Sequence, residues 1–145
     1  MTFEPLEITL NRKEVTEAVA SGTKAHIDSV AARLAERREP FIHSWDNDIN
    51  QALAQAAVTK WLNGRKGPIA RAASKDYGNL IISDKDNPSD TYVLVSCLTP
   101  VFRIEGFIRV SDAQEIPNCQ AQTQAGRRWW INKKHLRDPR EMGGR

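Results

Sequence analysis

The stretch from residue 79 to residue 110 constrains the fold most, because it is dense in strand-forming side chains and is interrupted only by short polar turns. Residues 79–83 (NLIIS) and residues 91–98 (TYVLVSCL) are short and rich in β-branched and aromatic side chains. The segment DKDNPSD between them has the Pro, Asn and Asp content typical of a turn. We therefore predict that these two segments form a β-hairpin.

A third strand should follow directly. Phe102 and Ile104 alternate with Arg103 and Glu105, which is the period of a strand with one buried face. The glycine that comes next, Gly106, favours a bulge or a bend before the strand continues to residue 110. The alternation places Glu105 on the solvent face. Residues 69 to 110 are thus expected to form the central sheet, with irregular chain over residues 111–126.

The N-terminal half carries helical signals after one short strand over residues 6–10. Asn11 and Glu14 have the spacing of a capping box, and the apolar residues that follow fit one helix face up to residue 34, with Gly22 as a candidate break. A second helix is expected from Asp46 to about Leu62, ended by a loop rich in Asn, Gly and Pro.

The fold class expected from this order is α+β, with N-terminal helices packed on a small mixed or antiparallel sheet. The length of 145 residues fits one domain, which we divide into a helical half (1–67), a sheet half (68–137) and a flexible tail (138–145). No apolar run is long enough to span a bilayer, and the first residues lack the pattern of a secretory signal. A cytoplasmic location without a membrane partner is the expectation.

Positive charge is concentrated at the C-terminal end. Residues 126–145 contain seven bases and two acids. Within this region the segment GRRWWINKKHLR sets two tryptophans among pairs of arginines and lysines, the combination expected of a nucleic-acid groove. If residues 129–131 form a strand, one tryptophan should lie in the core and the other on the opposite face.

The second helix and the strands after it resemble a known nuclease core. The stretch QALAQAAVTKWLNG, followed by IARAASKDYGNLIISDKDNPSDTYVLVSCLTPVFRIEGFIRV, is similar to small phage- and prophage-type proteins with a PD-(D/E)XK, restriction-endonuclease-like core. The resemblance covers about residues 6–137. In that family, a helix glutamate, an aspartate and an acid-x-lysine hold Mg²⁺, which activates water and stabilises charge on the scissile phosphate.

The catalytic positions of that family are changed in this chain. Gln55 stands where the resemblance places the helix glutamate, and an amide is a poorer ligand for Mg²⁺ than a carboxylate. Ile69 and Arg71 stand where the acid and the lysine would fall. The resemblance therefore implies a catalytically degenerate nuclease scaffold with no metal or other cofactor, and it favours a binding protein over an enzyme.

Other acids and nucleophiles provide weaker candidates for catalysis. The aspartates of DKDNPSD, namely Asp84, Asp86 and Asp90, are typical of a solvated turn. The three histidines lack the spacing of metal ligands, and the two cysteines lack a CxxC pattern. Cys97 lies in an apolar strand, where its thiolate is disfavoured.

Three functions follow in order of preference. The first is nucleic-acid binding through a basic aromatic edge formed by Arg71, Arg127, Arg128, Trp129, Trp130, Lys133, Lys134 and Arg137. The second is a phage or mobile-element inhibitor that binds a host nucleic-acid-handling or defence complex. The third is a Mg²⁺-dependent nuclease whose acids are displaced to positions such as Asp84 or Glu105.

Overall fold

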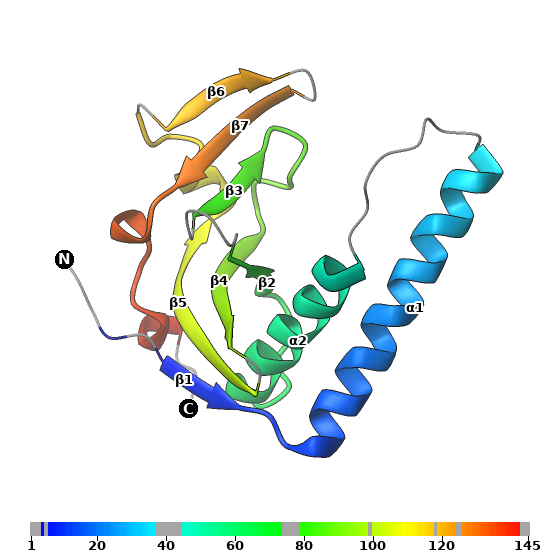
Figure 1. Ribbon diagram of the computed structural model, residues 1–145. Helices are drawn as coiled ribbons and strands as arrows, with labels where there is room; N and C mark the ends of the chain where they lie inside the picture. Colours follow the sequence, from blue (N-terminus) through cyan, green and yellow to red (C-terminus); the bar gives the residue numbers. More distant parts are fainter. Residues whose placement is uncertain are drawn as a thin grey trace.

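The chain is arranged in three layers: two helices, a mixed four-stranded sheet, and a smaller antiparallel sheet (Figure 1). The computed structural model describes residues 4, 6–36, 45–73, 79–98, 100–117, 119–123 and 126–142. The α+β class is confirmed: the second helix packs on the mixed sheet, and the first helix packs mainly on the second. No helix within these described ranges is both long and apolar enough to cross a membrane.

Each of the two sheets includes strands that lie far apart in the chain. They are β1 (Leu6–Thr9), α1 (Arg12–Glu36), α2 (Trp45–Trp61), β2 (Ile69–Ala72), β3 (Leu80–Ser83), β4 (Thr91–Leu98), β5 (Val101–Arg109), α3 (Val110–Ala113), β6 (Gln120–Thr123) and β7 (Gly126–Ile131), with 3₁₀ turns at Lys133–His135 and Pro139–Met142.

The larger sheet, which we call sheet A, has the strand order β1-β5-β4-β2. Its first three strands are antiparallel, whereas β2 runs parallel to β4 at the edge. Alternate residues of β4 enter two different cores: Val93 and Val95 pack under α2, and Tyr92 and Leu94 pack toward the smaller sheet. Sheet A is therefore the middle layer and is buried on both faces.

A bulge in β5 keeps both cores filled. Leu94 pairs with Gly106 and Val95 pairs with Ile104, so that Glu105 is an extra residue opposite β4. Ile104 before the bulge and Phe107 after it both face the helices, although their numbers differ in parity. The bulge predicted at Gly106 is confirmed. The solvent-facing position predicted for Glu105 is wrong, because the extra residue turns its side chain into a buried site.

The smaller sheet, sheet B, has the order β3-β7-β6 and corrects the predicted hairpin. The strand β3 pairs with β7, more than 40 residues later, and does not pair with β4. Leu80 and Ile82 of β3 are apolar on the same face as Trp129 and Ile131 of β7, and together they close the second core. The segment DKDNPSD therefore crosses between two sheets. Residues 120–123, expected to be irregular, form the edge strand β6.

Helix α1 begins at the predicted capping box and is continuous through Gly22. The Asn11 Oδ1 accepts from the Glu14 amide at 2.9 Å, and the Glu14 Oε1 accepts from the Asn11 amide at 2.8 Å. A Cβ built on Gly22 would lie 2.8 Å from the Ile49 Cα, so this glycine permits close contact between α1 and α2. The predicted break is wrong because the glycine serves helix packing.

Replacing Asn11 with alanine is expected to lower the free energy of unfolding by about 1 kcal/mol, because the first turn loses its side-chain acceptor. The backbone hydrogen bond with Asn11, and then Lys60, lower the pKa of Glu14. Because its pKa is lowered in the folded state, the Glu14 carboxylate stabilises the fold above the ordinary carboxyl pKa range. This stabilisation is lost as pH falls through the lowered pKa. Asn11→Ala keeps the backbone amide that binds Glu14, so its effect in urea unfolding should be similar at neutral and acidic pH. The effect of Glu14→Ala should instead shrink in acid, and an equal effect of Glu14→Ala at both pH values would contradict this assignment.

The chain after residue 137 is packed, at least to residue 142, where a flexible tail was expected. Pro139 is fully buried, and the Arg140 guanidinium donates to the Glu4 carbonyl at 3.0 Å. Arg65 donates in turn to the Met142 carbonyl at 3.2 Å. Residues 143–145 lie outside the described residues.

Candidate nucleic-acid interface

The two adjacent tryptophans of β7 point to opposite faces of sheet B, as predicted. Trp129 is 6% exposed and packs in the second core, whereas Trp130 is 37% exposed. The alternation of a strand requires this separation, since successive side chains project to opposite faces. The basic aromatic segment therefore contributes one ring to stability and one ring to the surface.

Trp130 lies on a surface that we call the outer face of sheet B. Ile81 is the register partner of Trp130 on β3, and it is also exposed. Arg128 lies two residues before Trp130 on β7, which places it on the same face beside Ser83 and Ala121. The outer face thus combines an aromatic ring, an aliphatic side chain and a guanidinium group.

Two further cations lie close to this surface in the chain. Arg127 and Lys134 are both exposed. Like Arg128, neither forms an ion pair within the part of the chain that the structure describes. Lys134 follows Asn132, whose side chain accepts from the Lys134 amide at 3.1 Å and starts a short turn immediately after β7. Their charge is therefore available to a phosphate.

The other three predicted cations are engaged within the protein. Arg71 stacks on Tyr92, with its guanidinium carbon 4.5 Å from the ring centroid, and donates to the Tyr92 hydroxyl at 3.1 Å. Lys133 lies 3.5 Å from the Glu105 carboxylate. Arg137 pairs with Glu141 at 2.9 Å and lies over the Phe107 ring. The structure therefore divides the predicted binding set into free and engaged members.

Glu105 is a buried acid whose carboxylate has two partners within the protein. Its carboxylate accepts from the Ser96 hydroxyl at 2.9 Å and faces Lys133, and its side chain is only 7% exposed. A buried carboxylate needs such partners, because an unpaired charge in the interior is strongly unfavourable. Lys133 is therefore engaged with Glu105 within the protein.

Gln55, Ile69 and Arg71, the positions compared with nuclease catalytic residues, lie together where α2 meets β2. Two glutamines of α2 bind the backbone of β2 there. The Gln55 Oε1 accepts from the Ala70 amide at 2.9 Å, and the Gln51 Oε1 accepts from the Ala72 amide at 3.1 Å. The Gln51 amide group also donates to the Ala70 carbonyl. Because β2 is an edge strand of sheet A, these side chains take the place of a neighbouring strand.

The aspartates of residues 84–90 accept hydrogen bonds from backbone amides and so hold the connection between the two sheets in place. The Asp84 carboxylate accepts from the Arg127 amide at 3.1 Å, and the Asp86 carboxylate accepts from the Ser83 amide at 2.8 Å. Asp90 uses its backbone, whose carbonyl accepts from the Val110 amide. Among the described residues, no three His, Cys, Asp or Glu side chains are grouped so that they could hold a metal ion.

The other reactive groups considered in the sequence are also accounted for. Burial raises the pKa of the Cys97 thiol to about 11, as expected for an apolar strand. The His26 Nδ1 lies 3.0 Å from Asp48 and links α1 to α2. His135 lies in the turn after β7, whereas His43 lies outside the described residues.

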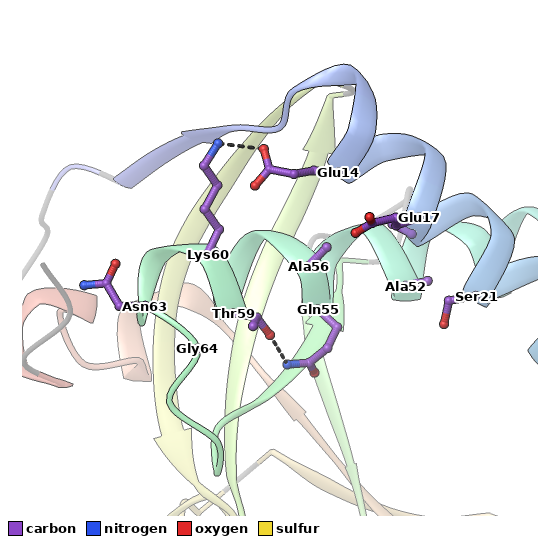
Figure 2. A pocket seen from close by; sticks show the side chains of 11 residues that line it. Glu14, Glu17, Ser21, Ala52, Gln55, Ala56, Thr59, Lys60, Asn63 and Gly64 are labelled. Carbon is purple, nitrogen blue, oxygen red and sulfur yellow. Dashed lines mark hydrogen bonds and ion pairs between the residues drawn. The ribbon is translucent and has the colours of Figure 1, made fainter.

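A groove of about 590 Å³ lies between α1 and α2 (Figure 2). Its floor is made by small side chains, and Glu14 and Glu17 of α1 face Gln55, Thr59 and Lys60 of α2 across it. Lys60 is occupied by the Glu14 carboxylate at 2.8 Å and by a backbone carbonyl. With Lys60 neutralised and two carboxylates on its rim, this groove does not suit a phosphate backbone.

A second cavity of about 340 Å³ lies where α2, β2 and β3 meet. Asn47, Asn50, Gln51 and Asn79 contribute amide groups to it, and Arg71 and Ile81 also line it. Ile81 therefore borders both this cavity and the outer face of sheet B. The cavity has a mixed polar and apolar lining and carries one guanidinium already stacked on Tyr92.

Sequence reasoning missed Ile81, Gln51 and the structural role of Gln55. The alternation in NLIIS is consistent with an outward Ile81, but the predicted hairpin with residues 91–98 places this residue beside a different strand from β7. The glutamines give no local signal, because their partners are backbone groups of a strand that follows α2. Comparisons of the chain with protein-family models, curated proteins and solved structures return no match.

Proposed function

We propose that this protein binds single-stranded nucleic acid on the outer face of sheet B. The observation that carries this proposal is the exposed Trp130 beside Arg128. An indole ring at a sheet surface offers a stacking platform for a base, and each such stack contributes about 1–3 kcal/mol. Arg128, Arg127 and Lys134 supply charge for the phosphates on either side. Ile81 adds apolar contact next to the ring.

The relation to a restriction-endonuclease-like core is part of the same proposal. What supports it is the order of α2, β2 and the following strands. Glutamine at position 55 departs from the glutamate of that family and supports only the loss of cleavage. In this proposal the scaffold retains nucleic-acid affinity without metal-dependent cleavage, and the face used is formed by β7 and β3. A protein partner in a host defence complex is the alternative that binding experiments distinguish.

The test compares two exposed tryptophans. We expect Trp130→Ala to weaken binding of a fluorescently labelled single-stranded oligonucleotide by about 5- to 150-fold, the equivalent of one lost stack. Trp45→Ala, which removes an exposed ring from the start of α2, is the matched control and should bind as the wild type does. Anisotropy titrations at low salt would measure both.

The salt dependence tests the electrostatic part separately. Replacing Lys134 with glutamine is expected to weaken binding at all sequences and to reduce the slope of log K against log salt by about 1. Lys13→Gln, an exposed lysine at the start of α1, serves as the control. If no single-stranded DNA or RNA is retained at low salt, or if Trp130→Ala binds as tightly as the wild type, the proposal is wrong.

A further inference from the structure

Helix α1 carries an apolar stripe that no described residue covers. Ile27 is 59% exposed, Val30 is 41% exposed and Leu34 is 76% exposed. Contact with α2 uses another face of the helix: at about 100° per residue, the buried Ala18 lies opposite Ile27. Figure 1 shows α1 as the outermost element, on the side of α2 away from sheet A.

The stripe has the spacing of a helix–helix seam. Ala20 and Thr23 precede the three large side chains on the same stripe, and the steps between successive members are three, four, three and four residues. This is the heptad repeat of residues that meet a second helix by knobs-into-holes packing. We propose that the seam binds α1 of a second copy of this chain in antiparallel orientation, with a twofold axis at Ile27.

Thr23 is the one polar member of the seam, and its position is compatible with helix packing. A threonine inside a helix can donate its hydroxyl to a carbonyl of the preceding turn. Thr16 does so in the same helix, since its hydroxyl donates to the Arg12 carbonyl at 2.7 Å. The same arrangement at Thr23 would satisfy the hydroxyl within α1 and leave the methyl group for contact with the second copy.

Side-chain size supports the antiparallel arrangement. With the axis at Ile27, Ala20 faces Leu34 of the second copy, so that a small side chain meets a large one at both ends of the seam. Thr23 and Val30 of the second copy lie within one residue of the same level, about 1.5 Å apart along the axis, and these two β-branched side chains have nearly the same shape. The space between the helices is then filled evenly along the seam. A parallel pair would instead place alanine against alanine at one end and leucine against leucine at the other.

Charge also favours this orientation. The seam itself contains no charged residue. Beside it, Lys24 and Asp28 form an ion pair at 2.7 Å within each helix. In the antiparallel pair Lys24 of one copy lies within about one helical turn of Asp28 of the other, so opposite charges approach each other across the axis. A parallel pair would place the two ion pairs on opposite edges of the seam, where they could not complement each other.

The length of the seam sets the expected strength. From Ala20 to Leu34 it spans about 21 Å of helix, at about 1.5 Å per residue. A stable interface buries at least about 1,000 Å², and two helix faces of this length lie near that lower limit. The dimer should therefore form reversibly and depend on protein concentration.

Sedimentation of the full chain over the micromolar to millimolar range tests the proposal. We expect a shift from the 16.3 kDa monomer toward twice that mass. Ile27→Glu should abolish the shift, because it places two carboxylates at the axis. Ala32→Glu is the control: it adds the same charge at an exposed position of α1 about 140° from Ile27 and should leave the dimer intact. Circular dichroism verifies that both variants fold.

Disulfide trapping separates the two orientations. Ile27→Cys should cross-link with itself under mild oxidation, as shown by a reducible dimer band. Ala20→Cys should cross-link with Leu34→Cys when the two variants are mixed, and neither should cross-link alone. A chain that stays monomeric at millimolar concentration, a dimer unaffected by Ile27→Glu, or self-linked Ala20→Cys would overturn the proposal.

Discussion

Replacing Trp129 with alanine should lower the free energy of unfolding by about 3–5 kcal/mol, one of the two largest effects expected in this protein. The ring is 6% exposed and packs with Leu80, Ile82 and Ile131 in the core between the two sheets. Its removal leaves a cavity that two sheets, held apart by their other side chains, cannot close. Urea unfolding followed by far-ultraviolet circular dichroism would measure the loss.

Two variants control this experiment. Trp129→Phe should be much milder, because the indole nitrogen of Trp129 has no hydrogen-bond partner among the described residues and a phenyl ring leaves no polar group buried. Trp130→Ala should lower stability by no more than about 1 kcal/mol, the scale of its lost cross-strand contact with Ile81. Equal losses from Trp129→Ala and Trp130→Ala would show that the division between core ring and surface ring is wrong.

The second large effect is expected at the edge of sheet A. Changing Gln51 and Gln55 together to leucine should destabilise the fold by about 2–4 kcal/mol, since buried backbone groups of β2 lose their partners at about 1–3 kcal/mol each. Each single change should give part of this loss. An exposed β2 edge should also make the double variant self-associate, which light scattering would detect.

A glutamine on the surface serves as the control. It shows whether a change from glutamine to leucine destabilises the fold wherever it is made. Gln120→Leu makes the same chemical change on the exposed strand β6 and should alter stability by no more than about 0.5 kcal/mol. If the double variant at positions 51 and 55 unfolds at the same urea concentration as Gln120→Leu, the two α2 glutamines do not stabilise the edge.

Local chemistry explains which parts of the fold could be predicted. The capping box at Asn11 depends on residues three apart, and the opposed tryptophans depend on strand alternation, so both are visible in the sequence. The pairing of β3 could not be predicted in the same way. The short turn after it is compatible with a hairpin, and the choice of β7 rests on matching apolar faces far apart in the chain.

The candidate site was predicted in part for the same reason. The exposed Trp130 and the nearby Arg128 follow from one strand, whereas the engagement of Arg71 with Tyr92 and of Lys133 with Glu105 depends on contacts between strands. Burial of Glu105 could not be seen from alternation, because the bulge shifts the parity of β5. Counting charges along the sequence therefore overestimated the free positive surface.

The bulge at Glu105 also limits how this chain can change in length over evolution. Residues before it fill the helical core with even-numbered side chains, and residues after it fill the same core with an odd-numbered one. Deleting Glu105 itself would leave a regular strand, because Phe107 would then have the same parity as Ile104. A one-residue deletion elsewhere in β5 would instead turn part of the strand inside out, bringing apolar side chains to the surface and charged ones into the core. Insertions and deletions should therefore be tolerated in the connections between the sheets and, within the β4–β5 pair, rejected everywhere except at Glu105.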